Sequence, residues 1–280
     1  MTINCKGELI DLTSPKVMGI LNITPDSFYD GGKHRKEHDI LLHVEDMLNE
    51  GAAFIDVGAY SSKPNVSYVS EEEELARIVP IVTSILKRFP NILLSIDTFR
   101  AKVAKQCIEI GAALINDISA GKLDNTMLAT IADLHVPYIM MHMRGTPQNM
   151  QSQTDYNNLT KEILFYFSER IAQARGLGIV DVIVDPGFGF AKTKEQNFEL
   201  LNNLELFKNL ELFKMLELPI LAGVSRKSMI YKTLNNSPQE ALNGTTVLNT
   251  IALQKGANIL RVHDVKEAVE CIKLVESLNL

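Results

Sequence analysis

This chain of 280 residues has little cysteine and no long apolar segment. Its three cysteines, Cys5, Cys107 and Cys271, are an odd number without the spacing of a metal site, which favours a reducing compartment. Cys107 and Cys271 lie in helical patterns, and we interpret them as buried apolar side chains. No apolar run approaches the ~18 residues of a membrane span, and the N-terminal residues lack a signal-like apolar core. We therefore expect a cytoplasmic protein.

Positive charge is also scarce. The formal net charge of −6 argues against a nucleic-acid groove, although it leaves room for a local anion site. The sequence shows no cluster of His and Cys residues that would indicate zinc, no P-loop and no Ser–His–Asp pattern. With 46% apolar and 22% charged residues, the composition is typical of a globular protein with a sizeable core.

Apolar runs of strand length alternate with helical patterns along the whole chain. The predicted strands are Val17–Ile23, Phe54–Ala59, Leu93–Thr98, Leu114–Ser119, Tyr138–Met143, Val182–Asp185, Pro219–Val224 and Asn258–Val262. The predicted helices are His38–Glu50, Ser70–Arg88, Ala101–Gly111, Asn125–His135, Leu159–Gly176, Leu204–Pro219, Ala241–Lys255 and Val265–Leu278. Near-continuous apolar strands separated by helices indicate parallel pairing. Eight such units in ~250 residues predict an α/β fold, a (β/α)8 TIM barrel, as a single domain over residues 1–280.

Three local features add detail to this fold. Weak alternation in Asn4–Leu12 predicts a short hairpin that plugs one end of the barrel. Ser70 and Glu73 form a capping-box pattern, and Glu71–Glu74 are interpreted as complementing the dipole of the helix that they begin. Leu204–Pro219 repeats a six-residue unit, which we interpret as a locally duplicated helix. Because six residues at ~100° each leave the copies about a third of a turn apart, this helix either breaks or has a wide apolar surface.

Polar side chains stand at the ends of the predicted strands. They are Asn22, Ser62, Asp97, Asn116, His142, Asp185, Lys227, Arg261 and His263. In a barrel the carboxyl ends of all the strands share one mouth, so these groups would meet there. A single strand-end Asp often only caps the next helix, and His142 is interpreted as a satisfied residue of the mouth. The joint pattern therefore predicts a site more strongly than any one member does.

One part of this set suits a flat heterocycle. A carboxylate such as Asp185 or Asp97 accepts two parallel N–H donors, and the Asn116 amide serves both donor and acceptor edges. Lys227 supplies a donor to a ring carbonyl or ring nitrogen. The faces of the ring would be covered by two apolar side chains, Met140 and Phe190.

Another part of the set suits an anion. Ser225–Ser228 follows the seventh predicted strand, and Arg261 and His263 end the eighth, where barrels commonly hold phosphate. Asn22 offers a neutral oxygen to a hard cation such as Mg²⁺, which would bridge phosphate oxygens. The strand ends thus predict a site for a flat, phosphate-bearing substrate.

Six segments resemble the motifs of the dihydropteroate synthases, in the same order and over essentially the whole chain. They are ITPDSF at Ile23–Phe28, IDT at Ile96–Thr98, NDIS at Asn116–Ser119, DPGFGF at Asp185–Phe190, SRKS at Ser225–Ser228 and RVHD at Arg261–Asp264. The resemblance implies a transferase of folate biosynthesis that joins (7,8-dihydropterin-6-yl)methyl diphosphate to 4-aminobenzoate with Mg²⁺. It also implies a homodimer, for which the helices Ala241–Lys255 and Val265–Leu278 are our candidate surfaces.

The resemblance implies a role for each site residue. The pterin would be held by Asp97, Asn116, Asp185 and Lys227. Diphosphate and metal would be served by Asn22, Ser62, Arg261 and His263, with Asn22 as the metal ligand. The aminobenzoate would lie among Pro25, Phe28, Ser62, Lys63 and Ser225. At Lys63 this family usually has Arg, whose bidentate contact Lys does not reproduce.

The charges suggest a dissociative mechanism with Asp97, Asp185, Lys227 and Arg261 as the catalytic groups. Loss of diphosphate leaves a cation on the pterin methylene, which Asp97 and Asp185 can stabilise. Mg²⁺, Arg261 and His263 would stabilise the departing anion. An arylamine is neutral at pH 7, so the reaction needs no strong general base.

Three other functions are compatible with parts of the pattern. A pterin-binding methyltransferase on the same barrel would not need the TPDSF loop or a diphosphate site. A non-catalytic paralogue that only binds pterin would be expected to lose Lys227, Arg261 or Asn22, and all three are present. A generic phosphate-binding barrel enzyme would not need the Asp and Asn residues assigned to the pterin.

Overall fold

The computed structural model describes residues 1–23, 33–60, 69–209 and 218–278. Pro25, Phe28, Ser62 and Lys63 lie outside these ranges, so the aminobenzoate residues predicted there stay predictions. Within the described residues no helix is long and apolar enough to cross a membrane.

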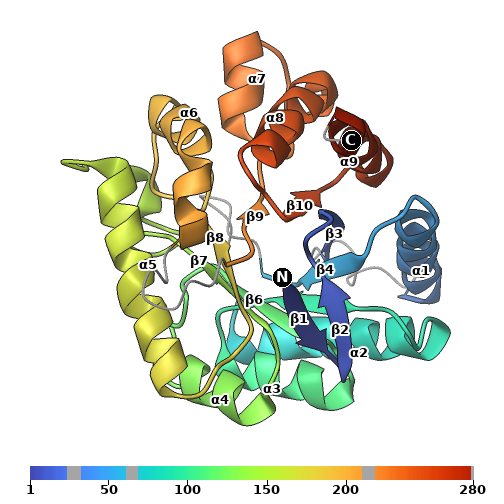
Figure 1. The fold of residues 1–280 in the computed structure, drawn as a ribbon. Coiled ribbons are helices and arrows are strands. Elements are labelled where there is room, and N and C mark those ends of the chain that lie inside the picture. The colour runs from blue at the N-terminus through green and yellow to red at the C-terminus, as the bar shows by residue number, and fades with distance from the viewer. Residues whose placement is uncertain (24–32, 61–68, 210–217, 279–280) are drawn as a thin grey trace.

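The fold is a parallel barrel surrounded by helices (Figure 1). Eight strands follow one another in the order β8-β7-β6-β5-β4-β3-β10-β9. They are β3 Lys16–Asn22, β4 Phe54–Gly58, β5 Leu94–Asp97, β6 Leu114–Asp117, β7 Tyr138–Met141, β8 Val182–Asp185, β9 Leu221–Ala222 and β10 Ile259–Val262. A parallel bridge between Val184 and Ile220 joins β8 to the segment before β9, which nearly closes the ring. The predicted (β/α)8 barrel is confirmed.

A two-stranded hairpin lies across one end of the barrel (Figure 1). Strands β1 Thr2–Cys5 and β2 Glu8–Asp11 pair antiparallel through a two-residue turn, in which Lys6 and Gly7 have φ of 56° and 87°. Ile3 and Cys5 pack against residues near the starts of the barrel strands, among them Met18 and Phe54. The predicted hairpin is confirmed, and it leaves the carboxyl ends of the strands, at the other end, open for a site.

The helices cover the outside of the strands. They are α1 Lys33–Asn49, α2 Glu71–Arg88, α3 Ala101–Ile110, α4 Met127–Leu134, α5 Leu159–Gly176, α6 Lys194–Asn202, α7 Ser228–Leu234, α8 Leu242–Gln254 and α9 Val265–Leu278. Between helices and strands lies one large apolar cluster, to which alternate strand residues such as Ile55, Val57 and Ile96 contribute. The residues between them in sequence point into the barrel, because successive side chains of a strand lie on opposite faces.

Between β8 and β9 the structure differs from the predicted helices. Leu204–Asn209 is a 3₁₀ helix with Leu204 and Phe207 fully buried, which fits a helix in which residues i and i+3 lie on one line. The second copy of the repeat lies mostly outside the described residues. The α-helix of this region is α6, which the prediction omitted although Thr193 and Gln196 form a complete capping box.

The start of α2 also differs from its prediction. Ser70 caps the helix by accepting a hydrogen bond from the Glu73 backbone N–H (3.2 Å), as the pattern predicts. Glu74, however, is fully buried and pairs with Arg100, and it accepts a hydrogen bond from Thr98 Oγ1 at 2.7 Å. A buried, paired carboxylate does more than complement a helix dipole. It ties α2 to the residues just after β5, where the site begins.

Candidate functional site at the mouth of the barrel

Strands β5, β6 and β8 bring the predicted acid and amide groups to the mouth. Asp97 ends β5 and stands in register beside Asn116 of β6, while Asp185 ends β8 beside Met141 of β7. Asn116 and Asp185 are buried, and the Asp97 side chain is 22% exposed. The carboxyl ends of β5, β6 and β8 therefore bring these three polar groups to the same mouth, where a flat ligand can reach them together.

Arg261 binds two carboxylates from neighbouring strands. Its Nε donates to Asp56 Oδ2 at 2.6 Å and its Nη2 to Asp97 Oδ2 at 2.7 Å. Asn116 Nδ2 also donates to Asp56 Oδ2, at 2.9 Å. Despite burial, which lowers it, the pKa of Arg261 is raised by Asp56 and Asp97. Burial raises the pKa of Asp97, and the Arg261 guanidinium opposes that rise.

Asp56 is a site residue that the sequence analysis missed. It is fully buried in the middle of β4, and its Oδ1 has no hydrogen-bond partner among the described residues. The alternation of β4 puts Phe54, Asp56 and Gly58 on the inner face, so Asp56 lies one layer below the strand ends. A lone carboxylate inside an otherwise apolar strand was the signal that could have revealed it, because buried charges are normally paired.

Lys227 contacts the backbone of the loop after β8 and the aromatic ring of Phe190 in that loop. Its Nζ donates to the Phe188 carbonyl oxygen and lies 5.1 Å from the centre of the Phe190 ring. Burial lowers the pKa of Lys227 to about 8, while Asp185 and Asp97 oppose the decrease. Burial raises the pKa of Asp185, and Lys227 opposes that rise most strongly. Each group thus opposes the effect of burial on the pKa of the other.

The anion side of the mouth is formed by the ends of β3, β9 and β10. Ser225 Oγ and His263 Nδ1 are 3.1 Å apart, and the His263 backbone N–H donates to Ser225 Oγ at 3.2 Å. Asn22 ends β3 with an exposed side chain. Arg226 is held away from this group by Asp264, with N···O distances of 2.6 and 2.9 Å. Of the two adjacent cations in the SRKS segment, Lys227 is therefore the one at the mouth.

A metal at the mouth would depend on Asn22 and on the substrate. Among the described residues there is no group of three or more His, Cys, Asp or Glu side chains that could hold a metal ion by itself. An exposed amide oxygen suits Mg²⁺, which commonly takes one or two protein oxygens and completes its shell with phosphate oxygens and water. The residues present thus fit an ion that arrives with a phosphate-bearing ligand.

The structure corrects the expectation for Met140. This residue packs in the outer cluster between strands and helices, whereas Met141 packs near the mouth in a cluster against which Phe190 lies. Met141 is in register with Asp185, so the two share the inner face. The prediction was off by one residue. Because successive residues of a strand point to opposite faces, it chose a side chain on the outer face.

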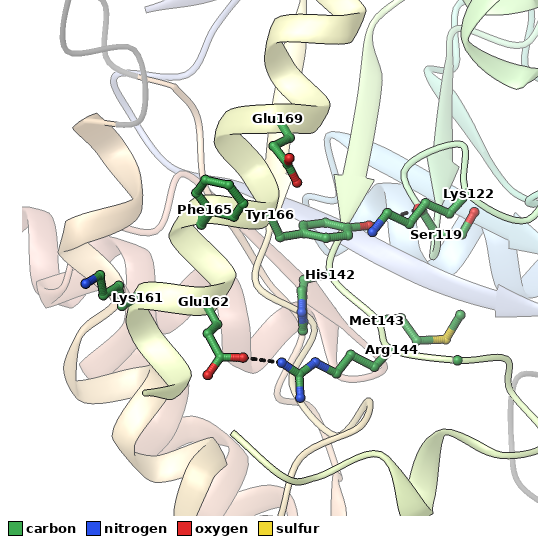
Figure 2. A pocket seen from close by; sticks show the side chains of 11 residues that line it. Ser119, Lys122, His142, Met143, Arg144, Lys161, Glu162, Phe165, Tyr166 and Glu169 are labelled. Atoms are coloured by element: carbon green, nitrogen blue, oxygen red, sulfur yellow. Dashed lines mark hydrogen bonds and ion pairs between the residues drawn. The ribbon is translucent and has the colours of Figure 1, made fainter. Parts of the chain in front are cut away.

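His142 also faces outward rather than into the mouth. Its ring meets the Tyr166 ring edge to face at 4.8 Å and lines a cavity of about 520 Å³ beside α5 (Figure 2). Its Nδ1 lies 3.0 Å from the Nζ of Lys192, a buried residue that the sequence analysis did not select. As predicted, His142 has its partners satisfied within the protein, but on the outer side of the strand end.

Comparisons with known proteins found similar proteins over nearly the whole chain. Residues 18–263 match the family described as pterin binding enzyme. The chain is 42% identical to the dihydropteroate synthase of Escherichia coli K12 over 99% of its own length and 96% of that protein. The structure matches that of Yersinia pestis dihydropteroate synthase in complex with a sulfonamide drug, with a TM-score of 0.90, 41% identity and coverage of 100% and 99% of the two chains. It also matches the Xanthomonas albilineans enzyme with 4-aminobenzoic acid, with a TM-score of 0.89, 34% identity and coverage of 99% and 98%.

Proposed function

Because this chain belongs to the dihydropteroate synthases of the pterin-binding enzyme family, we propose that it joins (7,8-dihydropterin-6-yl)methyl diphosphate to 4-aminobenzoate. Dihydropteroate synthases are transferases of folate synthesis, and the products here would be 7,8-dihydropteroate and diphosphate. The observation that carries the proposal is the convergence of Asp97, Asn116, Asp185 and Lys227 at one mouth. This set offers hydrogen-bond acceptors and donors to the polar edge of a flat pterin ring.

The pterin would lie among these groups with Phe190 and Met141 near its faces. Asp185 accepts one hydrogen bond from the Gly187 backbone N–H at 2.8 Å through Oδ1, so Oδ2 remains for a pterin N–H. Asn116 Nδ2 is committed to Asp56, which leaves its amide oxygen as an acceptor. Lys227 would donate to a pterin acceptor with the N–H groups that Phe188 leaves unused.

The reaction would proceed through a pterin cation. The bond between the pterin methylene carbon and the diphosphate oxygen breaks, and its electron pair leaves with diphosphate. The arylamine nitrogen then forms the new C–N bond and gives up a proton to water. Asp97 and Asp185 stabilise the intervening positive charge, because their carboxylates already stand at the mouth before the reaction begins.

The leaving diphosphate would be held by Asn22, Arg261 and His263. The Nε and Nη2 of Arg261 are occupied by Asp56 and Asp97, so Nη1 is the part of the guanidinium left for the anion. Mg²⁺, when bound with the substrate and Asn22, would neutralise part of the diphosphate charge. The test is diphosphate release, which should require both substrates and Mg²⁺; release without 4-aminobenzoate, or none at all, would contradict the proposed function.

The aminobenzoate site is proposed from the resemblance alone for Pro25, Phe28, Ser62 and Lys63, which lie outside the described residues. Ser225, its described member, is buried beside His263. If Lys63 approaches the departing diphosphate, Lys63→Ala should lower kcat several-fold while leaving pterin affinity unchanged, and Lys63→Arg should keep or raise kcat. Steady-state kinetics with calorimetric pterin binding separate these outcomes; wild-type kinetics in Lys63→Ala would show a solvated loop charge.

We also propose a homodimer in the cytoplasm. Helices α8 and α9 pack side by side on the outside, away from the mouth, and present exposed apolar side chains at Val247 and Leu274 (51% and 69% exposed). Burying such groups is the usual driving force of stable self-association. Light scattering at micromolar concentration should give twice the chain mass of 31.2 kDa, and a monomer mass would contradict this proposal.

A further inference from the structure

A buried lysine lies near the end of the loop that joins β8 to α6. Lys192 is 5% exposed, and its Nζ lies 2.9 Å from the Gly187 carbonyl oxygen, 3.0 Å from the Phe190 carbonyl oxygen and 3.0 Å from His142 Nδ1. Burial lowers the pKa of Lys192 well below its usual value, an effect that Asp185 opposes, and the three partners match the three N–H donors of the protonated form. Its side chain thus joins the end of β7 to both halves of the loop.

His142 is held in one form by this contact. Burial, together with the charges of Lys192 and Arg144, lowers the pKa of His142 well below its usual range, so the ring is neutral. When Nδ1 accepts from the Lys192 Nζ, 3.0 Å away, the ring proton lies on Nε2. The other side of the ring packs on Tyr166 in the wall of the cavity beside α5 (Figure 2). The ring is therefore a fixed acceptor for the ammonium.

The loop that Lys192 holds begins directly after Asp185 and contains Phe190, two groups of the proposed pterin site. Its other polar groups are also paired: the Gly187 N–H with Asp185, the Phe188 carbonyl with Lys227, and the Gly189 N–H with Asn197 Oδ1 at 2.6 Å. Gly187 has φ of +74°, and a Cβ there would come within 2.1 Å of the His142 carbonyl oxygen. The loop is thus packed directly onto the strand end that carries His142.

We propose that Lys192 is a positioning residue of the reaction, whose Nζ, in contact with His142 and two loop carbonyls, fixes the loop so that Asp185 and Phe190 meet the pterin. This role rests on the proposed function. A methionine would fill nearly the same volume without the cost of burying a charge among neutral acceptors. The two loop carbonyls explain why a hydrogen-bond donor stands at this position, because an apolar side chain could not bind them.

The first experiment compares Lys192→Met with Lys194→Met, its exposed neighbour on the same segment, in the full-length protein. Calorimetric binding of the pterin diphosphate should weaken at least tenfold in Lys192→Met and stay unchanged in Lys194→Met. The KM for 4-aminobenzoate, measured at saturating pterin diphosphate, should stay near the wild-type value in both. A purely structural role would lower the melting temperature without this difference between the two substrates.

The second experiment varies the acceptor. His142→Asn places an amide oxygen near the position of Nδ1, whereas His142→Leu removes the acceptor, and both open onto the existing cavity rather than a sealed core. His142→Asn should recover most of the pterin affinity that His142→Leu loses, and Lys192→Met combined with His142→Leu should be no weaker than Lys192→Met alone. The comparison of His142→Asn with His142→Leu tests the role of Lys192 even if Lys192→Met does not fold.

Either of two results would overturn the role proposed for Lys192 without affecting the proposed function. The first is a pterin affinity within twofold of wild type in folded Lys192→Met, and the second is an equal loss of pterin affinity in His142→Asn and His142→Leu. A wild-type protein that binds no pterin would instead remove the proposed function, and this role with it.

Discussion

Arg261→Met is expected to lower the free energy of unfolding by about 3–5 kcal/mol, the usual cost of removing one partner from a buried ion pair. The guanidinium bonds to both Asp56 and Asp97, and Asp56 is fully buried. Without Arg261 these two carboxylates would face each other with no cation between them. Urea denaturation of wild type and variant at pH 7 measures the difference.

The pH dependence supplies a second readout for this variant. Burial already raises the pKa of Asp97 and Arg261 opposes the rise, so loss of Arg261 should raise this pKa further above its unfolded value. A group with a raised folded pKa contributes stability at low pH and loses it as pH rises through that pKa. The deficit of Arg261→Met should therefore shrink at pH 5 and grow at pH 8.

A matched control is Arg88→Met. Arg88 pairs with Glu45 at the surface, where the two side chains are 42% and 39% exposed, and such pairs contribute about 0–1 kcal/mol. If Arg261→Met costs no more than Arg88→Met, the cluster of Arg261, Asp56 and Asp97 does not stabilise the fold as described.

Asp185→Asn is expected to weaken pterin binding by about 1–3 kcal/mol, the cost of leaving a buried polar group unpaired. The carboxylate accepts from the Gly187 N–H on Oδ1 and offers Oδ2 to the pterin. An amide has one oxygen, and if that oxygen keeps the Gly187 hydrogen bond, its NH₂ group faces a pterin donor. The loss should appear in calorimetric titration with the pterin diphosphate.

The control for this variant is Asp181→Asn, just before the start of the same strand. Asp181 accepts a hydrogen bond from the Asn4 backbone N–H at 2.9 Å, at the hairpin end of the barrel, far from the mouth. Asp181→Asn should leave pterin affinity unchanged. Unchanged affinity in a folded Asp185→Asn protein would remove Asp185 from the pterin site.

The sequence by itself was enough to predict the barrel and most of the mouth. Strand-length apolar runs that alternate with helices allow few arrangements, and parallel strands in a closed sheet bring their carboxyl ends together. The sequence alone therefore groups five residues at this mouth: Asp97, Asn116, Asp185, Lys227 and Arg261. Their grouping follows from where each run ends, which is visible in the chain.

The tertiary structure decided which face of each strand points inward and how buried charges are paired. Met140 and Met141 are both apolar, so only the register with Asp185 shows which of them lies inside. Asp56 resembles a chance carboxylate in an apolar run until Arg261 is seen beside it, 205 positions away in sequence. Lys192 likewise resembles a solvated loop lysine in the sequence. Its three partners are two backbone carbonyls and the ring of His142, which directly follows β7. Partners so distant in sequence come together only through the folded backbone, and a local pattern cannot carry that information.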